Sequence, residues 1–372
     1  MLTAIAFNYL KSPYSLPLRW CTAMWMLGLP FGLASQALAS DVSSASVALT
    51  VLPSDQQQTH WMAVNAINQQ TVWISGSQGR VARTTDAGKT WQYFQPGPSD
   101  LQFRDIAALD DRVAYALSVG ENGRSRIYST HNGGRSWQQR YRADADRFLN
   151  CFAFSDSGEA WVYGDTVNEQ WTIVRSADGR NWLTAASAIA EPAQANEGGF
   201  ASGGGCVRYA NETWAMVTGN ADKARLLLKG RFGIRFQVVD TPMSAGPMAG
   251  ITSVWPTSPD SGYIVGGNLQ QDEAAGPRLY HYQEKQFSAL AEPPLAGGAL
   301  YHVSLADNYL LVNNPAGAAL LALTDDHDPA HKASSSQWQS VSTANVWSSS
   351  CISRRCWLVG KDGYVAYFSL PN

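Results

Sequence analysis

The sequence predicts an all-β chain whose mature part is a β-propeller of seven blades, and three observations predict it. An aromatic residue followed by small or aliphatic residues recurs seven times, at a mean spacing of about 47 residues. Short runs of alternating apolar and polar residues flank each copy, as strands require. Glycine and asparagine turns separate these runs, and no amphipathic helix pattern is found in the mature part. One blade of four short strands needs about this length of chain.

Each copy of the repeat predicts one blade of a single mature domain, residues 40–372. The aromatic residues that begin the copies are Trp73, Tyr115, Trp161, Trp214, Tyr263, Tyr309 and Trp357. The predicted blades span approximately 60–97, 99–142, 147–190, 195–242, 246–290, 295–341 and 344–372. The last of these has room for only three strands, so we expect residues 48–52 to add the fourth strand and close the ring.

Residues 1–39 are predicted to be a secretory signal peptide. They contain Lys11 and Arg19 and no acidic residue, then an apolar run over 20–33, then Ala-Leu-Ala before a cleavage site after Ala39. The alternative is a membrane anchor, but the apolar run is shorter than the roughly 20 residues that span a bilayer. Cleavage would leave a periplasmic or secreted protein with no stable membrane insertion.

Charge and composition exclude several classes of partner. The whole chain carries a net charge of −3, and removal of the leader makes it more negative. A mildly acidic protein has no electrostatic basis for binding nucleic acid or anionic lipid. We therefore expect a monomer that binds a protein, a peptide or a glycan.

Four cysteines follow the leader, and their even number in an exported chain predicts two disulfides. Cys351 and Cys356 are close enough to close one hairpin. Cys151 and Cys206 fall in the inner regions of consecutive blades and form the second predicted pair. Zinc binding is the alternative role for these cysteines, but no second CxxC pair or paired histidines accompany them.

The connection after the third predicted strand carries a short motif in the first three blades. Residues 84–91 read Thr-Thr-Asp-Ala-Gly-Lys-Thr-Trp, and related copies occupy 130–137 and 176–182. In such turns the Asp or Asn accepts backbone N–H bonds, glycine supplies a positive φ, and tryptophan packs between sheets. These residues are Asp86, Gly88 and Trp91, then Asn132, Gly134 and Trp137, then Asp178, Gly179 and Trp182. The motif resembles the Asp box of bacterial neuraminidase (BNR) repeats, so we expect these aspartates to support the turn rather than catalysis.

Longer stretches resemble a family of exported BNR propellers related to photosystem II stability and assembly factors. The resembling segments are 103–106, 126–130, 148–154, 164–165 and 197–201, and the likeness covers residues 60–270 best. Members of this family are often labelled oxidoreductase or sialidase-like, while the better-understood relatives are non-catalytic assembly factors that hold partner proteins and pigment. The resemblance therefore implies a binding or scaffolding role.

The alternative function is a secreted sialidase-like glycoside hydrolase. A sialidase needs an arginine triad, for which Arg104, Arg126 and Arg208 are available, and it usually has a Phe/Tyr-Arg-Ile-Pro segment that residues 231–235 do not match. A general glycosidase needs two carboxylates at a suitable separation, and Asp105, Asp165 and Glu197 are the candidates.

Cofactor and metal chemistry have less support. No glycine motif opens a helix and no haem motif is present, so an oxidoreductase is not supported and no cofactor is expected. The glycine-rich run 197–205 is interpreted as a mobile loop that enters blade four, because no following helix would complete a phosphate site. His327 and His331 lie in an acidic loop that we interpret as solvated, and no metal is expected.

The binding site is predicted at the channel mouth where the innermost strands begin, over blades two to four. The candidate residues combine charged, amide and imidazole groups, which suit a peptide or glycan. They are Arg104, Asp105, Asn150, Asp165, Glu197 and His302. An inter-blade salt bridge is the structural alternative for the Arg104–Asp105 pair, since buried charges are costly unless they are paired.

Overall fold

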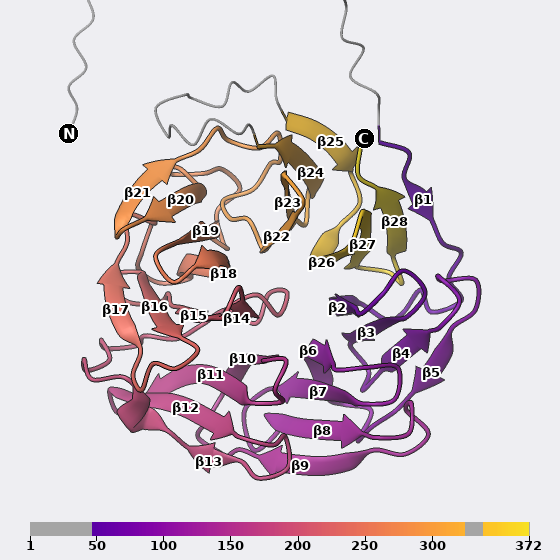
Figure 1. Ribbon diagram of the computed structural model, residues 1–372, viewed down its shortest axis with the longest axis horizontal. Coiled ribbons are helices and arrows are strands. Elements are labelled where there is room, and N and C mark those ends of the chain that lie inside the picture. Colours follow the sequence, from indigo (N-terminus) through magenta and orange to yellow (C-terminus); the bar gives the residue numbers. More distant parts are fainter. Residues whose placement is uncertain (1–46, 324–337, 372) are drawn as a thin grey trace, which may run out of the picture. The chain divides into compact units, whose positions relative to one another are not determined.

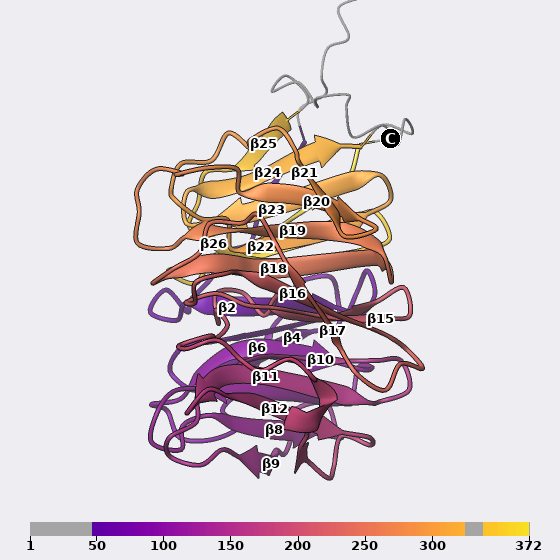
Figure 2. The same cartoon turned by 90° about the vertical axis from the view of Figure 1, so that its left-hand side faces the viewer.

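The computed structural model describes residues 47–323 and 338–371, and the strands within these residues form seven antiparallel sheets of four strands each. The sheets follow one another around a ring; the first strand of each sheet lies nearest the centre in six blades, and β26 takes this place in the seventh (Figure 1). Figure 2 shows the same ring from its edge. The prediction of a seven-bladed all-β propeller is confirmed. No helix within these described ranges is both long and apolar enough to cross a membrane.

The strands of each blade are consecutive in the chain, except in the last blade. Blade one contains β2 (Trp61–Ala66), β3 (Val72–Gly76), β4 (Val81–Thr84) and β5 (Gln92–Phe94). Blade two contains β6 (Gln102–Ala108), β7 (Ala114–Val119), β8 (Arg126–Thr130) and β9 (Gln138–Arg142). Blade three contains β10 (Leu149–Phe154), β11 (Ala160–Val167), β12 (Gln170–Ser176) and β13 (Leu183–Thr184). A short 3-10 helix, η1 (Ala186–Ala188), follows. Blades four and five contain β14 (Val207–Ala210), β15 (Thr213–Val217), β16 (Arg225–Gly230) and β17 (Gln237–Asp240), then β18 (Ala249–Ser258), β19 (Ser261–Asn268), β20 (Leu279–Gln283) and β21 (Gln286–Ala289). Blade six contains β22 (His302–Ala306), β23 (Tyr309–Asn314), β24 (Gly317–Ala322) and β25 (Trp338–Ser342).

The ring closes by pairing the start of the described chain with its end. Blade seven contains β26 (Val346–Ile352), β27 (Arg355–Gly360) and β28 (Val365–Ser369), and its outer strand is β1 (Thr50–Val51). Thr50 pairs with Tyr367, and Val51 pairs with Ala366. The strand β1 thus lies within the segment 48–52 that was expected to close the ring. Each of the seven sheets in the described residues has four strands.

The repeated aromatic residue lies on the second strand of every blade, which explains the sequence repeat. Five of the seven aromatic side chains are buried, and Tyr263 and Tyr309 are partly buried. Because each aromatic occupies the same register, it packs in the interface with a neighbouring sheet. Burial of a large ring is worth about 2 kcal/mol or more, so the repeat contributes strongly to blade packing.

A glycine three residues after the aromatic has a steric cause in blades one, three, five and seven. Opposite each of these glycines the innermost strand shifts its pairing register by one residue. A Cβ at Gly76, Gly164, Gly266 or Gly360 would overlap a carbonyl oxygen at the beginning of that innermost strand or of the residue directly before it. Only glycine permits this close approach of the two backbones.

The turns between the third and fourth strands of the first three blades are held by side-chain hydrogen bonds. The Asp86 carboxylate accepts bonds from the Thr90 N–H at 2.9 Å and the Thr90 hydroxyl at 2.6 Å. Asn132 accepts from the Ser136 N–H at 3.0 Å, and Asp178 accepts from the Asn181 N–H at 2.9 Å. The bonds from Thr90 lower the pKa of Asp86 to about 2. These carboxylates are therefore ionised acceptors within their own turns.

Both predicted disulfides are present and confirmed. Cys351 and Cys356 join β26 and β27 across one hairpin. Cys151, on β10, is bonded to Cys206, which directly precedes β14, so this bond links the innermost regions of blades three and four. The leader 1–39 and the loop with His327 and His331 lie outside the described residues.

Candidate functional site

The glycine-rich run 198–205 lies inside the ring, beside β14 and close to its centre (Figure 1). Its residues are buried except for the half-buried Gly204. The Ser348 hydroxyl of blade seven donates to the Gly203 carbonyl at 2.9 Å, and the Val254 N–H of blade five donates to the Gly205 carbonyl at 3.1 Å. We name residues 198–205 the channel plug. The interpretation as a mobile loop is therefore corrected to a packed segment that crosses the channel.

The plug needs its glycines because it contacts strands from several blades. A Cβ at Gly205 would overlap the Ser253 side chain of blade five, and one at Gly204 would overlap the Asp105 carboxylate of blade two. Gly204 also has a φ of 69°, in the left-handed region that favours glycine. These steric limits explain the glycine run without any phosphate-binding role.

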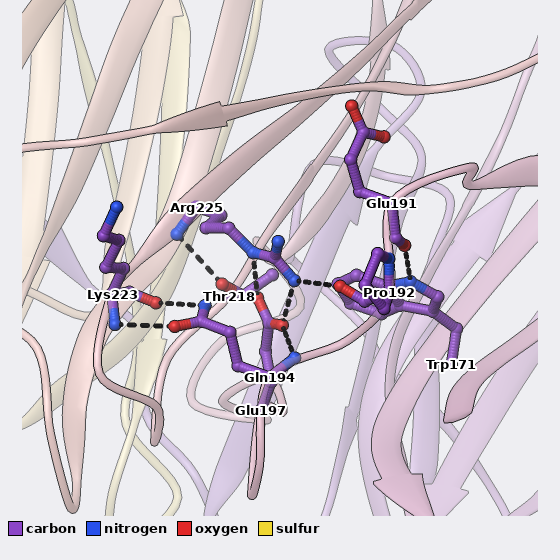
Figure 3. Close-up of polar contacts among 8 residues, drawn as sticks. All are labelled: Trp171, Glu191, Pro192, Gln194, Glu197, Thr218, Lys223 and Arg225. Carbon is purple, nitrogen blue, oxygen red and sulfur yellow. Dashed lines mark hydrogen bonds and ion pairs between the residues drawn. The ribbon is translucent and has the colours of Figure 1, made fainter. Parts of the chain in front are cut away.

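Glu197, which directly precedes the plug, is completely buried and forms an ion pair with Arg225 on β16 (Figure 3). The Arg225 Nε donates to Glu197 Oε1 at 2.8 Å, and the Arg225 Nη2 bonds Oε2 of the same carboxylate, which makes the pair bidentate. Oε2 also accepts from the Gln194 N–H at 2.8 Å. The Glu197 carboxylate is thus fully occupied inside the protein.

Other groups complete this cluster around Arg225 (Figure 3). The Arg225 Nη2 donates to the Pro192 carbonyl at 3.0 Å, and the guanidinium lies 5.1 Å from the centre of the Trp171 ring. The Thr218 hydroxyl accepts from the Arg225 N–H at 2.9 Å. The Glu197–Arg225 cluster therefore fixes the beginning of the plug, while the Cys151–Cys206 disulfide fixes its end.

Arg104 and Asp105 point to different partners, and neither forms an ion pair within 4.0 Å among the described residues. Arg104 donates to the Ala201 carbonyl of the plug at 3.3 Å and lies 5.6 Å from the centre of the Trp347 ring. Asp105 is buried, and its two oxygens accept from the N–H groups of Ile106 and Phe152, both at 2.9 Å. The inter-blade salt bridge considered from the sequence is absent here. A backbone bond to Phe152 of blade three takes its place.

Asn150 and Asp165 form a pair beside the plug rather than a free polar surface. Asn150 is buried, and its Nδ2 donates to Asp165 at 2.7 Å. The Gly199 N–H donates to the same carboxylate oxygen at 3.2 Å. Burial raises the pKa of Asp165, and these two bonds oppose the rise. The pair thus supports the first residues of the plug.

A pocket of about 380 Å³ lies in the channel next to the C-terminal part of the plug. Every blade contributes its innermost strand to the lining, and Gly203 and Gly204 of the plug contribute as well. The lining residues include the far ends of these strands, such as Asn65, Leu109 and Ser350. The pocket is therefore bounded in part by the plug and lies toward the mouth where the innermost strands finish.

The pocket lining contains five charged or titratable side chains, which are Asp105, Asp156, Arg208, Tyr209 and His302. Asp156 is exposed, whereas Arg208 and His302 are in contact with each other. The Arg208 Nη2 lies 3.1 Å from His302 Nε2, and His302 Nδ1 lies 3.2 Å from the Ser349 hydroxyl. Arginine has no acceptor, so Nε2 must accept and Nδ1 must carry the proton. The Arg208 guanidinium also lies over the Trp255 ring, 4.4 Å from its centre.

Burial controls the protonation of Asp105, Arg208 and His302. It lowers the pKa of His302 well below its usual value, with Arg208 acting in the same direction. It also lowers the pKa of Arg208 to about 10, opposed by Asp105, so Arg208 stays cationic at neutral pH. Burial raises the pKa of Asp105 well above its usual range, opposed by its two N–H donors and by Arg208.

The buried neutral His302 predicts a loss of stability in acid. An unfolded histidine takes up a proton below about pH 6.5, whereas folded His302 resists it, so the unfolded state binds more protons as the pH falls. The stabilising contribution is complete above pH 6.5, and we expect a loss of up to about 2 kcal/mol at pH 5. Asp105 acts in the opposite direction, because its raised pKa favours the folded state on acidification.

Urea unfolding of the wild type and of His302→Gln at pH 7 and pH 5 separates the effect of the His302 imidazole on stability from that of the Asp105 carboxyl. The wild type should lose more stability than His302→Gln over this interval, since both proteins retain Asp105. Equal losses in the two proteins would mean that His302 does not remain neutral in the folded chain.

The sequence-predicted residues are thus distributed over two regions. Asp105 and His302 line the pocket, whereas Arg104, Asn150, Asp165 and Glu197 contact or support the plug. Of the arginine triad, Arg126 lies on β8 and donates to the Gly123 carbonyl at 2.7 Å, away from the two arginines on innermost strands. Trp255 and Tyr209 also line the pocket and were not among the predicted site residues.

Comparison with known proteins shows the fold and no family. No family model matches the chain, and no curated protein matches it. A structure of YCF48 bound to D1 peptide is 15% identical with a TM-score of 0.56, covering 87% of this chain and 97% of that one. YCF48 from Cyanidioschyzon merolae is 12% identical with a TM-score of 0.56, covering 87% of this chain and 99% of that one.

A structure of a different kind of protein is similar as well. A catalytically inactive virginiamycin B lyase from Staphylococcus aureus, with quinupristin, is 9% identical with a TM-score of 0.61, covering 88% of this chain and all of that one. At such low identity these similarities concern the arrangement of the blades alone.

Proposed function

We propose that this chain is an exported, non-catalytic binding propeller that holds a segment of a protein or peptide at the mouth of its central pocket. The observation that carries this proposal is the pocket itself, which is lined by two glycines of the plug and by all seven blades. A central pocket of this kind can hold the end of a chain, while the surrounding blades offer surface to the rest of the partner. The similar YCF48 structure that holds a peptide supports this type of use.

The composition of the mouth also supports a peptide ligand. Leu109 is 43% exposed, and the half-buried Phe154, Tyr209 and Trp255 lie in the same lining. Aromatic residues next to a few polar groups favour peptide recognition, because they supply contact area at a low cost in side-chain entropy.

The candidate catalytic groups are engaged within the protein, which argues against the glycosidase alternative. Glu197 is ion-paired with Arg225, and both oxygens of Asp105 accept backbone N–H bonds. Both ring nitrogens of His302 have partners as well.

We also propose that residues 1–39 are a signal peptide, that the protein is periplasmic or secreted, and that residues 40–372 form a single mature domain. The turns between the third and fourth strands of the first three blades are proposed to be Asp boxes. The two disulfides support export.

A charge at the mouth should disrupt partner capture. Peptides are selected on the immobilised wild-type protein from a random displayed library, and their affinities are measured for Leu109→Asp and Leu183→Asp. We expect Leu109→Asp to weaken the selected peptides by roughly tenfold or more, because an apolar contact is replaced by a charge that must be desolvated. Leu183, 71% exposed on the outer strand of blade three, is the matched control and should change little.

Selected peptides that bind both variants as tightly as the wild type would place the binding surface elsewhere and overturn the proposal. Turnover of fluorogenic glycosides that disappears in Asp105→Asn would favour the hydrolase instead.

A further inference from the structure

Arg208 occupies a position that the other blades fill mainly with apolar residues. On β14, Arg208 pairs with Ala215, the residue that follows the repeated aromatic Trp214. The pairing registers place the following residues at the equivalent position of the other blades: Val64, Ile106, Phe152, Val254, Leu305 and Ser349. Blade four therefore has a cation where the regular repeat would bury an aliphatic or aromatic side chain.

This cation has no carboxylate close enough for an ion pair in the part of the chain that the structure describes. No Asp or Glu among these residues lies within 4.0 Å of the Arg208 guanidinium, although seven other arginines in the same ranges form such pairs. Asp105 acts on Arg208 only from a greater distance, where it opposes the lowering of the Arg208 pKa. The Nε atom is buried and has no acceptor. Both Asp105 oxygens already accept backbone bonds. Arg208 as a whole is partly buried. A charge held in such a position without a counterion in contact is costly, and a fold retains one only where something compensates for it.

The surroundings of Arg208 match an anion that is attached to an apolar group. The Trp255 ring covers one face of the guanidinium and His302 occupies Nη2, which leaves other edges of the planar group without a partner among the described residues. A carboxylate is planar and accepts the two parallel bonds that a guanidinium donates. Leu109 and Phe154, nearer the mouth, provide the apolar contact.

We propose that Arg208 is a carboxylate-binding residue, and that the segment held in the pocket is the C-terminal end of a peptide whose last side chain is apolar. The inference deepens the proposed function and depends on it for the peptide part. A small organic acid with an apolar body presents the same chemistry, so the experiment distinguishes the two sources.

Isothermal titration calorimetry tests the proposal on the wild-type mature protein. The probes are random-sequence hexapeptide pools ending in Leu or Phe, each made with a free C-terminal acid and with a C-terminal amide, together with 3-phenylpropanoate. We expect the acid pools to bind about 10- to 100-fold more tightly than the amide pools, the range for hydrogen bonds to charged groups. Arg208→Gln should abolish this preference.

Arg83→Gln is the matched control, because Arg83 also lies over a tryptophan ring and also has a buried Nε without an acceptor, but sits on the third strand of blade one. It should keep the full preference for the acid. The comparison of acid with amide on the wild type needs no variant, so it remains decisive if Arg208→Gln does not fold.

The outcomes separate this inference from the proposed function. Acid and amide pools of equal affinity, sensitive to Leu109→Asp, would overturn the carboxylate site and leave the peptide-binding function standing. Arg208-dependent binding of 3-phenylpropanoate without binding of either peptide pool would support the carboxylate site and overturn the peptide as its source. An acid preference unchanged in a folded Arg208→Gln protein would overturn the assignment to Arg208.

Discussion

Glu197→Ala is expected to lower the free energy of unfolding by about 3–5 kcal/mol, the cost of removing one partner of a buried ion pair. Glu197 is 0% exposed and Arg225 is 7% exposed, so the substitution leaves a guanidinium in the interior without its carboxylate. The Pro192 carbonyl and the Trp171 ring remain beside Arg225, but neither carries a charge that neutralises it. Urea unfolding at pH 7 measures the difference.

Glu191→Ala is the matched control, because Glu191 lies in the same connection but is exposed (Figure 3). We expect it to change stability by less than about 0.5 kcal/mol. Combining Glu197→Ala with Arg225→Met should restore a large part of the lost stability, since no uncompensated charge is then left. A Glu197→Ala effect as small as that of Glu191→Ala would show that the pair does not anchor the plug. It would also return Glu197 to the list of available carboxylates.

The number of blades could be predicted because the repeat reflects a constraint that every blade shares. The second-strand aromatic must fill the interface between sheets in every blade, and in blades one, three, five and seven the glycine after it must admit the shifted innermost strand. Both constraints act within about 15 residues of sequence, so they leave a periodic pattern. The closing strand was predictable for a related reason, because a ring with an incomplete last blade would expose an edge.

The plug could not be predicted, because its position depends on contacts distant in sequence. Ser348, which holds Gly203, lies 145 residues further along the chain, and Arg104, which holds Ala201, lies 97 residues before it. A glycine run carries no local signal that distinguishes a packed crossing of a channel from an exposed loop. Glu197 was considered as a site residue for the same reason, since its partner Arg225 is 28 residues away on another strand.

The pocket residues were only partly accessible from the sequence. Asp105 and His302 stand out as polar residues near the starts of innermost strands, and both line the pocket. The sequence shows Arg208 as one arginine among several. Only the pairing register of its strand shows that it occupies a position at which most other blades have an apolar residue. Aligning the seven innermost strands through the residue after each repeated aromatic would have revealed a cation at a position that is apolar in five blades. Whether these residues bind a partner remains a prediction.

Removing the two disulfides separately is expected to destabilise the propeller unequally. Cys151–Cys206 closes a segment with a sequence separation of 55, whereas Cys351–Cys356 closes one of only 5. In the loop-entropy description, a cross-link stabilises by restricting the unfolded chain, by about 4 kcal/mol for the longer segment and about 2 kcal/mol for the shorter one. The double substitutions Cys151→Ala/Cys206→Ala and Cys351→Ala/Cys356→Ala should therefore differ by about twofold in urea unfolding.

The larger loss should also have a local consequence, because Cys206 directly follows the plug, while the other pair closes a hairpin within blade seven. In Cys151→Ala/Cys206→Ala, the plug keeps its anchor at Glu197 but loses the covalent one, so residues 198–205 should become more susceptible to limited proteolysis under native conditions. Cys351→Ala/Cys356→Ala is the matched control and should leave cleavage in this segment unchanged. Equal stability losses together with equal cleavage would mean that the bond between blades three and four does not hold the plug in the channel. The Glu197–Arg225 pair and the contacts of Gly203 and Gly205 would then be sufficient to keep it there.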